Sequence, residues 1–401
     1  MQYDFTSMIE RAGHDAIAVD LQENDFWKLP QGNTKPGFDK IPMWIADMSF
    51  PTAPCVTERI LARASHPIYG YFVPSDEYYE AIIRWQAESF GVKDLHKKNI
   101  GYENGVLGGI TSALHVLCTP GEPVLVHSPT YTGFTTQLER NGYPAILSPL
   151  KPDADGIPRM DLEDMEQKLR EYKIHAALFC SPHNPSGRVW ERWELEQAME
   201  LFRKYDVYVI SDEIWSDLTL FGYRHIPTQS VSDDARMRTI AFYAPSKTFN
   251  LAGLIGSYRI VYNSRLQAQL THYEALGHYN DMNVLSMHAL IGAYQPEGRV
   301  WMEELKSVLE ENILTAYNFF NNVEGVTLAK PQGTYVIVPD FQGLCAAKGK
   351  TLAQLLEAGV EVGVLWRDGR PFHIPYGIRM ALGLPAAKLN EALSRLQEHV
   401  L

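Results

Sequence analysis

The sequence contains few cysteines. Four occur among its 401 residues, far apart and without a CxxC pair, at Cys55, Cys118, Cys180 and Cys345. A disulfide framework and the common zinc sites need a characteristic cysteine spacing, so this pattern argues against both. We therefore expect reduced thiols, no metal site and a cytoplasmic location.

Long apolar runs and a surplus of basic residues are also missing. No stretch approaches the roughly 18 consecutive apolar residues of a membrane-spanning helix, and the acid-containing N-terminal residues do not resemble a signal peptide. The formal charge of −12 argues against binding to a phosphate backbone, which needs a basic face. We expect neither a membrane nor a nucleic acid among the partners.

Low-complexity linkers and fixed-period repeats are absent as well. The composition, with 45% hydrophobic and 21% charged residues, is that of an ordinary globular protein. The chain is long enough for two domains with sizeable cores.

Strand-like and helical stretches alternate along the chain. Helical stretches such as 194–204 separate short runs rich in β-formers, which we expect at 124–127, 145–147, 176–180, 207–211, 239–243 and 257–261. The alternation predicts an α/β fold with a mostly parallel sheet and helices on both faces. A long helix over 300–321 leads into a smaller α/β domain with a strand over 333–338. The expected parts are an N-terminal segment packing with the small domain, a large domain and the small C-terminal domain, at 1–48, 49–295 and 296–401.

A lysine follows one of the strand-like runs. Lys247 lies in Ala244-Pro-Ser-Lys-Thr-Phe-Asn-Leu-Ala-Gly-Leu254, between the run 239–243 and a turn that contains glycine. Burial and nearby cations lower the pKa of an amine, and a neutral amine forms an imine with an aldehyde such as pyridoxal phosphate. A lysine at a strand end is more often a surface residue, so this interpretation depends on further segments.

Two other apolar runs end in polar side chains. Asp212 closes the run from Val207, at a strand end where open parallel sheets place ligand-binding groups. A carboxylate there can keep a pyridine nitrogen protonated, which makes the ring an electron sink. The run 176–180 leads into Ser-Pro-His-Asn-Pro, a rigid turn that presents the Asn184 amide as a donor for a phenolate oxygen. Singly, Asp212 could be a helix cap and Asn184 an ordinary Asx turn.

A glycine-rich segment and a tyrosine complete the set. Residues 102–109 include Gly105, Gly108 and Gly109 and lead into a helix with a regular apolar face. The N-terminus of such a helix offers backbone N–H groups to a phosphate, although short glycine-rich patterns are often plain turns. Tyr131 follows the run 124–127 and can either stack on a planar cofactor or belong to the core or rim.

The ordered set resembles a known family. The glycine-rich segment, Pro-Thr-Tyr131, Asn184-Pro-Ser-Gly, Asp212-Glu and Ser246-Lys247 are similar to motifs of the fold-type I pyridoxal phosphate (PLP) enzymes of the aminotransferase superfamily. Within it, the segments 43–50 and 66–71, with Ser-Pro-His-Asn-Pro and Ser-Lys-Thr-Phe-Asn, resemble the PatB/MalY-type cystathionine β-lyases, or cysteine-S-conjugate β-lyases. The likeness covers roughly residues 3 to 385.

The resemblance implies pyridoxal 5'-phosphate as the cofactor and gives these residues roles. Lys247 would carry the cofactor as an imine, Asp212 would pair with the ring nitrogen, Asn184 would bind the ring hydroxyl and Tyr131 would stack on the ring. The other implied site residues are the phosphate-binding Gly105, Val106, Leu107 and Ser246, Tyr71 from a second subunit, and Arg379 for the substrate α-carboxylate. The resemblance also implies a homodimer with shared active sites.

Three places depart from the family pattern. Ile255 stands eight residues after the lysine, where many aminotransferases have a phosphate-binding arginine, and this favours the lyase branch. The cofactor-binding position three residues after Asp212 is usually tyrosine in aminotransferases and histidine in the lyases, but here it is Trp215, which cannot accept a proton. The segment 364–373 replaces a glycine-rich stretch that shapes the substrate pocket. Its basic side chains are either pocket or surface groups: Arg367, Arg370 and His373.

The cofactor permits more than one reaction. The lyase motifs favour β-elimination from an L-cysteine S-conjugate such as cystathionine, which gives a thiol, pyruvate and ammonia. The altered pocket segment keeps transamination, and γ-elimination on another amino acid, as alternatives. A PLP-binding regulator would need an appended DNA-binding domain, and the sequence shows none.

Overall fold

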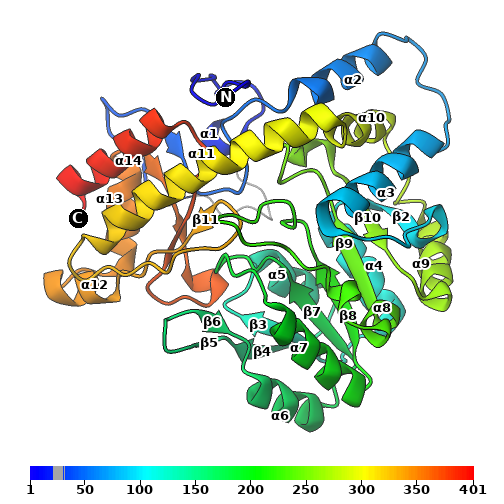
Figure 1. Ribbon diagram of the computed structural model, residues 1–401. Helices are drawn as coiled ribbons and strands as arrows, with labels where there is room; N and C mark the ends of the chain where they lie inside the picture. Colours follow the sequence, from blue (N-terminus) through cyan, green and yellow to red (C-terminus); the bar gives the residue numbers. More distant parts are fainter. Residues whose placement is uncertain (21–29, 31) are drawn as a thin grey trace. The chain divides into compact units, whose positions relative to one another are not determined.

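The computed structural model describes residues 1–20, 30 and 32–401, and the chain divides into two compact units. Unit 1 comprises 1–51, 185–187 and 304–401, and unit 2 comprises 52–184 and 188–303. The helix α11, Pro296–Asn321, begins in unit 2 and ends in unit 1 (Figure 1). The domain boundaries expected after residues 48 and 295 stay predictions.

Unit 2 is built on a seven-stranded sheet with the order β2-β10-β9-β8-β7-β3-β4 (Figure 1). The strands from β9 to β4 pair in parallel, whereas β10 is antiparallel to both β9 and β2. The predicted α/β fold with a mostly parallel sheet is confirmed. The strands are β2 Ile100–Asn104, β3 Val124–Ser128, β4 Ala145–Pro149, β7 Ala176–Cys180, β8 Tyr208–Asp212, β9 Thr239–Tyr243 and β10 Gly256–Ile260.

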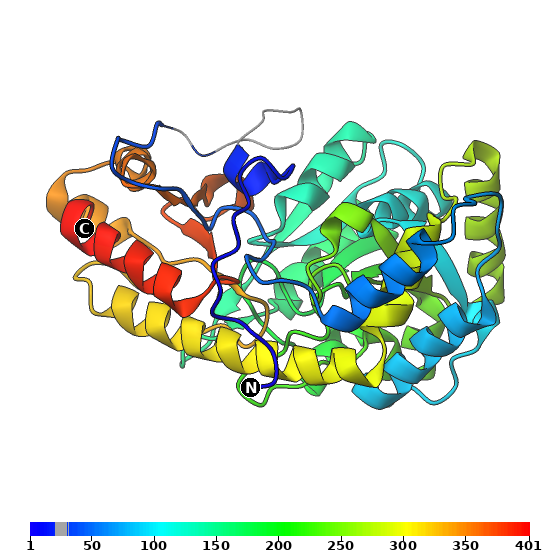
Figure 2. The ribbon, with the colours of Figure 1, turned by 90° about the horizontal axis from the view of Figure 1, so that it is seen from above.

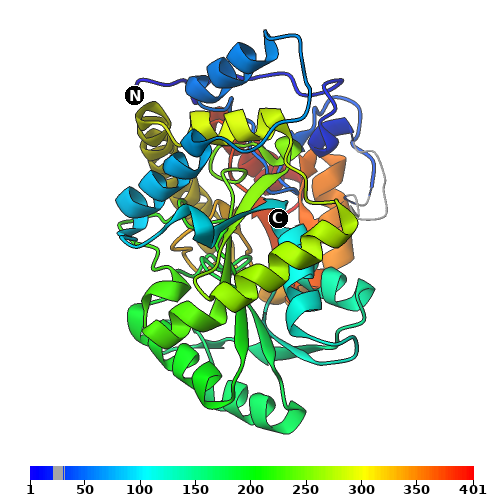
Figure 3. The ribbon, with the colours of Figure 1, turned by 90° about the vertical axis from the view of Figure 1, so that its right-hand side faces the viewer.

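The central strands are buried on both faces, and alternate side chains enter two different cores. On β7, Leu178 packs into one core with side chains of α4 and α9, whereas Phe179 packs into the other with side chains of α6 and α7. Helices therefore cover both faces of the sheet (Figure 3). The helices of these layers are α4 Val106–Leu117, α5 Thr132–Arg140, α6 Leu162–Tyr172, α7 Arg192–Lys204, α8 Asp233–Arg238 and α9 Ser264–Gly277.

Local signals in the sequence set the ends of the helices. Ser75 accepts a hydrogen bond from the amide of Tyr78 at 3.3 Å and caps α3, Asp76–Phe90, which ends at Gly91 with a left-handed φ of 70°. Glu191 and Glu194 form a reciprocal capping box at the start of α7, so this helix begins before the predicted residue 194.

The remaining elements of unit 2 lie outside the sheet. α2 packs closely against α10. The absence of a side chain at Gly292 permits this approach, because a Cβ there would lie 2.7 Å from the Cys55 carbonyl oxygen. These elements are α2 Pro54–Ala64, α10 Val284–Ala293, the short paired strands β5 Lys151–Pro152 and β6 Pro158–Arg159, and three 3₁₀ turns at Lys97–Asn99, Thr228–Ser230 and Ala252–Leu254.

Unit 1 contains two small sheets, β1-β12 and β11-β14-β13. The helix α14 lies beside the C-terminal part of α11 (Figure 2). The predicted strand over 333–338 shrinks to the two residues of β11, because Thr334 has a φ of 66° and its hydroxyl accepts from the Val336 amide at 3.1 Å. The elements are α1 Ile17–Asp20, β1 Ile41–Pro42, β11 Val336–Ile337, α12 Gln342–Lys348, α13 Leu352–Glu361, β12 Val364–Leu365, β13 Arg367–Asp368, the 3₁₀ turn Arg370–Phe372, β14 Ile378–Ala381 and α14 Ala386–His399.

The four cysteines are buried and have free thiols. Among the helices that the structure describes, we find none with the length and apolar character needed to cross a lipid bilayer.

Candidate active site

The segments singled out in unit 2 meet at one edge of its sheet. β3, β7, β8 and β9 run in the same direction, and their carboxyl ends lead to Tyr131, Asn184, Asp212 and Lys247. β2 has the same direction because the antiparallel β10 stands between it and β9, so Gly105 also follows at this edge. Carboxyl ends of strands are where open α/β sheets bind ligands.

Asp212 is the last residue of β8, opposite Cys180 on β7 and Phe242 on β9. Its carboxyl group is buried and accepts a hydrogen bond from the Ile214 amide at 3.0 Å. Burial raises the pKa of Asp212 to about 7, although this bond and the charge of Lys247 act in the opposite direction. A cation bound beside this carboxyl would favour its charged form, as a pyridinium nitrogen does.

Lys247 lies after β9, within electrostatic range of Asp212. Its Nζ atom stands 5.7 Å from the centre of the Trp215 ring, and Trp215 is buried. The indole therefore packs beside the lysine amine and offers it a cation–π contact, but no proton acceptor. The departure from the family pattern at Trp215 is thus located next to the proposed reactive amine.

Asn184 follows β7 and is buried. Its backbone N–H donates to the Cys180 sulfur at 3.4 Å, and its side-chain Oδ1 has no hydrogen-bond partner among the described residues. The unpartnered Oδ1 atom can only accept a hydrogen bond, and the Nδ2 group of the same buried amide is the one that would donate to a ring oxygen of a ligand.

Gly105 begins α4. Its φ of 80° belongs to the region that favours glycine, and no side chain caps this helix. The first amide groups of a helix have no intrahelical acceptor, so the Val106 and Leu107 N–H groups belong to an anion-binding end. Together, a helix N-terminus for a phosphate, a carboxyl for a ring nitrogen, an amide for a ring oxygen and an amine for an aldehyde fit PLP.

Tyr131 precedes α5, and its ring lies over Gly133. A Cβ at Gly133 would lie 2.3 Å from the Tyr131 Cε1 atom, and the Phe134 ring packs edge-on against Tyr131 with centroids 5.4 Å apart. The glycine therefore leaves the space that the Tyr131 ring occupies.

Two further predicted residues of unit 2 lie on loops. Ser246 directly precedes Lys247, and its carbonyl accepts from the Leu251 amide at 3.0 Å. Tyr71 is fully exposed on the segment between α2 and α3. Its contact with a second subunit stays a prediction.

Arg379 belongs to unit 1, where it lies on β14. The side chain is buried, donates from Nη1 to the Trp44 carbonyl oxygen at 3.4 Å and stacks on the Phe372 ring, 5.2 Å from its centre. These contacts fix the orientation of the guanidinium group, as a carboxylate clamp requires.

A buried network that no sequence motif predicts lies beside Asp212. The Glu213 carboxylate accepts from Tyr243 at 2.6 Å, from the Thr228 amide at 3.0 Å and from Ser211 at 2.9 Å, and lies 2.7 Å from His225 Nε2. Burial opposes this charge, but His225 and the hydrogen bonds hold the pKa of Glu213 below its usual range. The network ties the ends of β8 and β9 together, and only its Asp-Glu pair stood out in the sequence.

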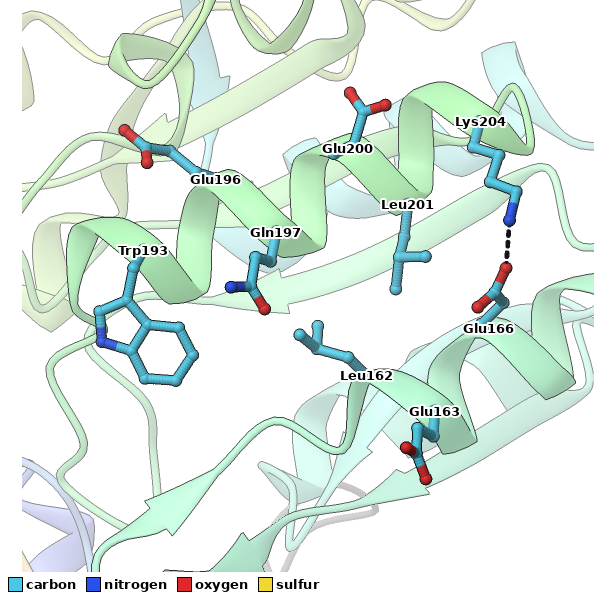
Figure 4. A pocket seen from close by; sticks show the side chains of 9 residues that line it. All are labelled: Leu162, Glu163, Glu166, Trp193, Glu196, Gln197, Glu200, Leu201 and Lys204. Atoms are coloured by element: carbon cyan, nitrogen blue, oxygen red, sulfur yellow. Dashed lines mark hydrogen bonds and ion pairs between the residues drawn. The ribbon is translucent and has the colours of Figure 1, made fainter.

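A separate hollow of about 450 Å³ lies between α6 and α7 (Figure 4). Lys204 pairs with Glu166 in it, and Glu200 is paired with Arg203 at 2.6 Å. None of the predicted site residues lines it, and ion pairs neutralise much of its charge, so we interpret it as a solvated surface. In the part of the chain that the structure describes, no group of histidine, cysteine and acidic residues is arranged to hold a metal ion.

Known proteins resemble this chain in both sequence and fold. The family model for aminotransferase class I and II matches residues 39–396. Cystathionine beta-lyase PatB of Bacillus subtilis is 33% identical over 363 residues, which cover 90% of this chain and 92% of PatB, and protein MalY of Escherichia coli is 29% identical over 98% of each chain. The crystal structure of the PLP-bound C-S lyase from Staphylococcus hominis, 26% identical, superposes with a TM-score of 0.89 over 100% of this chain and 99% of that one. The predicted resemblance and fold type are confirmed, and the chain belongs to the aminotransferase class I and II family.

Proposed function

We propose that the protein is a PLP-dependent carbon–sulfur β-lyase that acts on an L-cysteine S-conjugate such as cystathionine and releases a thiol, pyruvate and ammonia. The observation that carries this proposal is the placement of Lys247 beside the buried carboxyl of Asp212, at the ends of the neighbouring strands β9 and β8. The relatives named as cystathionine and C-S lyases support the same cofactor and reaction.

The residues at the sheet edge divide the binding of the cofactor among them. The backbone of Gly105, Val106 and Leu107 and the Ser246 side chain hold its phosphate, and Asn184 donates to its ring oxygen. Asp212 keeps a proton at the ring nitrogen, and Tyr131 covers the ring. When bound, PLP withdraws electrons from the substrate Cα atom.

The chain's own groups then handle the substrate. Arg379 binds the α-carboxylate and orients the Cα–H bond, and the Lys247 amine, which the substrate amine would release from the cofactor, would remove that proton. Loss of the proton at Cα and of the thiolate at Cβ, followed by hydrolysis, yields pyruvate and ammonia. Trp215 beside Lys247 offers no competing acceptor and keeps water from one side of the amine.

Ile255 supports the lyase branch over the aminotransferases. This residue stands directly before β10 at the same edge as Gly105, with its side chain half exposed, where an arginine would add a phosphate ligand. Transamination, typical of the wider family, and γ-elimination are the competing reactions.

The proposal includes the assembly, the domains and the location of the protein. Exposed apolar side chains gather around Tyr71, as expected for a face that a second copy covers in a homodimer with shared active sites. Residues 49–295 form the cofactor-binding domain, with 1–48 and 296–401 in the smaller one, close to the limits of the two compact units. Four buried thiols suit the reducing cytoplasm.

One assay tests the reaction. The purified holoenzyme is incubated with cystathionine and a panel of L-amino acids, with and without a 2-oxo acid, and pyruvate, ammonia, thiol and new amino acid are measured. We expect pyruvate, ammonia and homocysteine from cystathionine without any 2-oxo acid. Faster amino-group transfer to the 2-oxo acid across the panel would replace the lyase with an aminotransferase.

Borohydride reduction tests the cofactor independently of the substrate. The holoenzyme should be yellow, and reduction should fix PLP to Lys247, as located by peptide mass spectrometry. An adduct on another lysine, or no chromophore after reconstitution with PLP, contradicts the assignment.

A further inference from the structure

A second arginine stands directly opposite Arg379. In the antiparallel pair of β13 and β14, Arg367 is the register partner of Arg379, so the two side chains leave the same face of the sheet. Arg379 is buried, whereas Arg367 is partly exposed and accessible to a ligand.

Both guanidinium groups are held against one ring. The Cζ atoms of Arg367 and Arg379 lie 5.3 and 5.2 Å from the centre of the buried Phe372 ring. Stacking on an aromatic face restricts the orientation of each guanidinium.

The acid next in sequence, Asp368, does not share the face of this pair. Asp368 leaves the opposite face of β13 and binds Arg370, with a closest distance of 2.7 Å. Arg370 is exposed. The sequence left Arg367 and Arg370 alike as pocket or surface groups, and the structure separates them: Arg370 is a surface residue, and Arg367 accompanies the carboxylate-binding arginine.

We propose that Arg367 determines substrate specificity by binding a second anionic group, a carboxylate on the chain attached to the substrate sulfur, while Arg379 binds the α-carboxylate. This inference rests on the proposed function and narrows it to L-cysteine S-conjugates that carry a distal carboxylate. Two fixed guanidinium groups on one face match two carboxylates of one molecule, because each can form a forked, charge-assisted pair.

Two matched conjugates test the proposal. S-(2-carboxyethyl)-L-cysteine and S-propyl-L-cysteine differ in the distal carboxylate, and wild-type kcat/KM should favour the first by about 10- to 100-fold. Arg367→Gln should remove this preference by lowering kcat/KM for the carboxylate conjugate far more than for S-propyl-L-cysteine, Arg367→Lys should keep part of the preference, and Arg370→Gln should keep all of it. Absence of the preference in the wild type, or an equal loss for both conjugates in Arg367→Gln, overturns the proposal.

A binding measurement separates this inference from the proposed reaction. By calorimetry, the holoenzyme should bind pimelate, whose carboxylates have the same spacing as those of the carboxyethyl conjugate, at least about 10-fold more tightly than heptanoate, and Arg367→Gln should abolish the difference. If neither conjugate is cleaved but this difference depends on Arg367, the lyase reaction is wrong and the anion site stands. If both conjugates are cleaved and the difference is absent, the anion site is wrong and the lyase stands.

Discussion

At the scale of the residue, the cofactor contact proposed for Asp212 is linked to the stability of the fold. A carboxyl group with a raised pKa binds its proton more tightly in the folded state than in the unfolded chain. Its contribution to stability is complete below the ordinary pKa of 3.8 and is lost as the pH rises towards about 7. Burial of this carboxyl group therefore makes the cofactor-free protein less stable at neutral pH than at acidic pH.

Asp212→Asn removes the loss of folding stability that ionisation of this buried carboxyl group causes. Above pH 7, the cofactor-free variant should be more stable than cofactor-free wild type by on the order of 2–4 kcal/mol, whereas near pH 4 the two should agree. Urea unfolding at both pH values measures the difference. The same variant should retain PLP poorly, because its amide cannot hold the proton at the ring nitrogen. A stability difference that does not change with pH would show that Asp212 ionises normally.

Arg379 supplies the second prediction at this scale. Arg379→Ala removes the forked partner of the α-carboxylate. Transition-state binding, measured from the decrease in kcat/KM for cystathionine, should weaken by about 2–5 kcal/mol. Arg379→Lys should recover only part, since an ammonium group lacks the planar fork. Arg370→Ala serves as the control, because Arg370 is exposed and paired with Asp368. Full activity in Arg379→Ala would mean that another group binds the carboxylate.

At the scale of the element, the first turn of α5 contains a glycine, Gly133, that helix formation does not require. Alanine would be the better helix former at Gly133, but its Cβ would meet the Tyr131 ring at 2.3 Å. Gly133→Ala should therefore displace Tyr131 and weaken PLP retention, at a cost of about 1–3 kcal/mol in folding free energy. Dialysis against buffer and thermal unfolding measure the two effects. Thr135→Ala on the same helix should change neither, and unaltered PLP retention in Gly133→Ala would separate Tyr131 from the cofactor.

The elements also show how much of the secondary structure could be predicted from the sequence. Apolar β-rich runs predicted β7 and β9 to the residue, because strands buried on both faces leave a continuous signal. The strand around β11 was overestimated, since the left-handed φ of Thr334 depends on a turn that no periodicity reveals.

Some features of the candidate site could likewise be predicted from the sequence, and others could not. Lys247, Asp212 and Asn184 follow recognisable strands, so their motifs could be found. The pairing of Glu213 with His225, and of Arg367 with Arg379, depends on tertiary contacts and strand register, which spacing along the chain does not encode.

At the scale of the whole molecule, assembly is the principal prediction. Tyr71 lies among exposed apolar side chains of one segment, which also includes Ile68, Tyr69 and Val73. The protein should sediment as a two-fold dimer, and Tyr71→Phe should weaken PLP retention by removing one hydrogen-bond donor to the phosphate, without dissociating the dimer. Val73→Asp places a charge on the same face and should weaken the dimer itself. A catalytically competent monomer would refute the shared site.

The edge of the seven-stranded sheet has a consequence for how such enzymes diverge. Tyr131, Asn184 and Lys247 lie on separate loops, each after its own strand, so a substitution in one loop alters the pocket while the hydrogen-bonded ladder keeps its register. Trp215 and Ile255 illustrate this, since both differ from the family pattern beside strands that keep their pairing. New substrate ranges can therefore arise by exchange of single loops, with selection on chemistry largely separated from selection on folding.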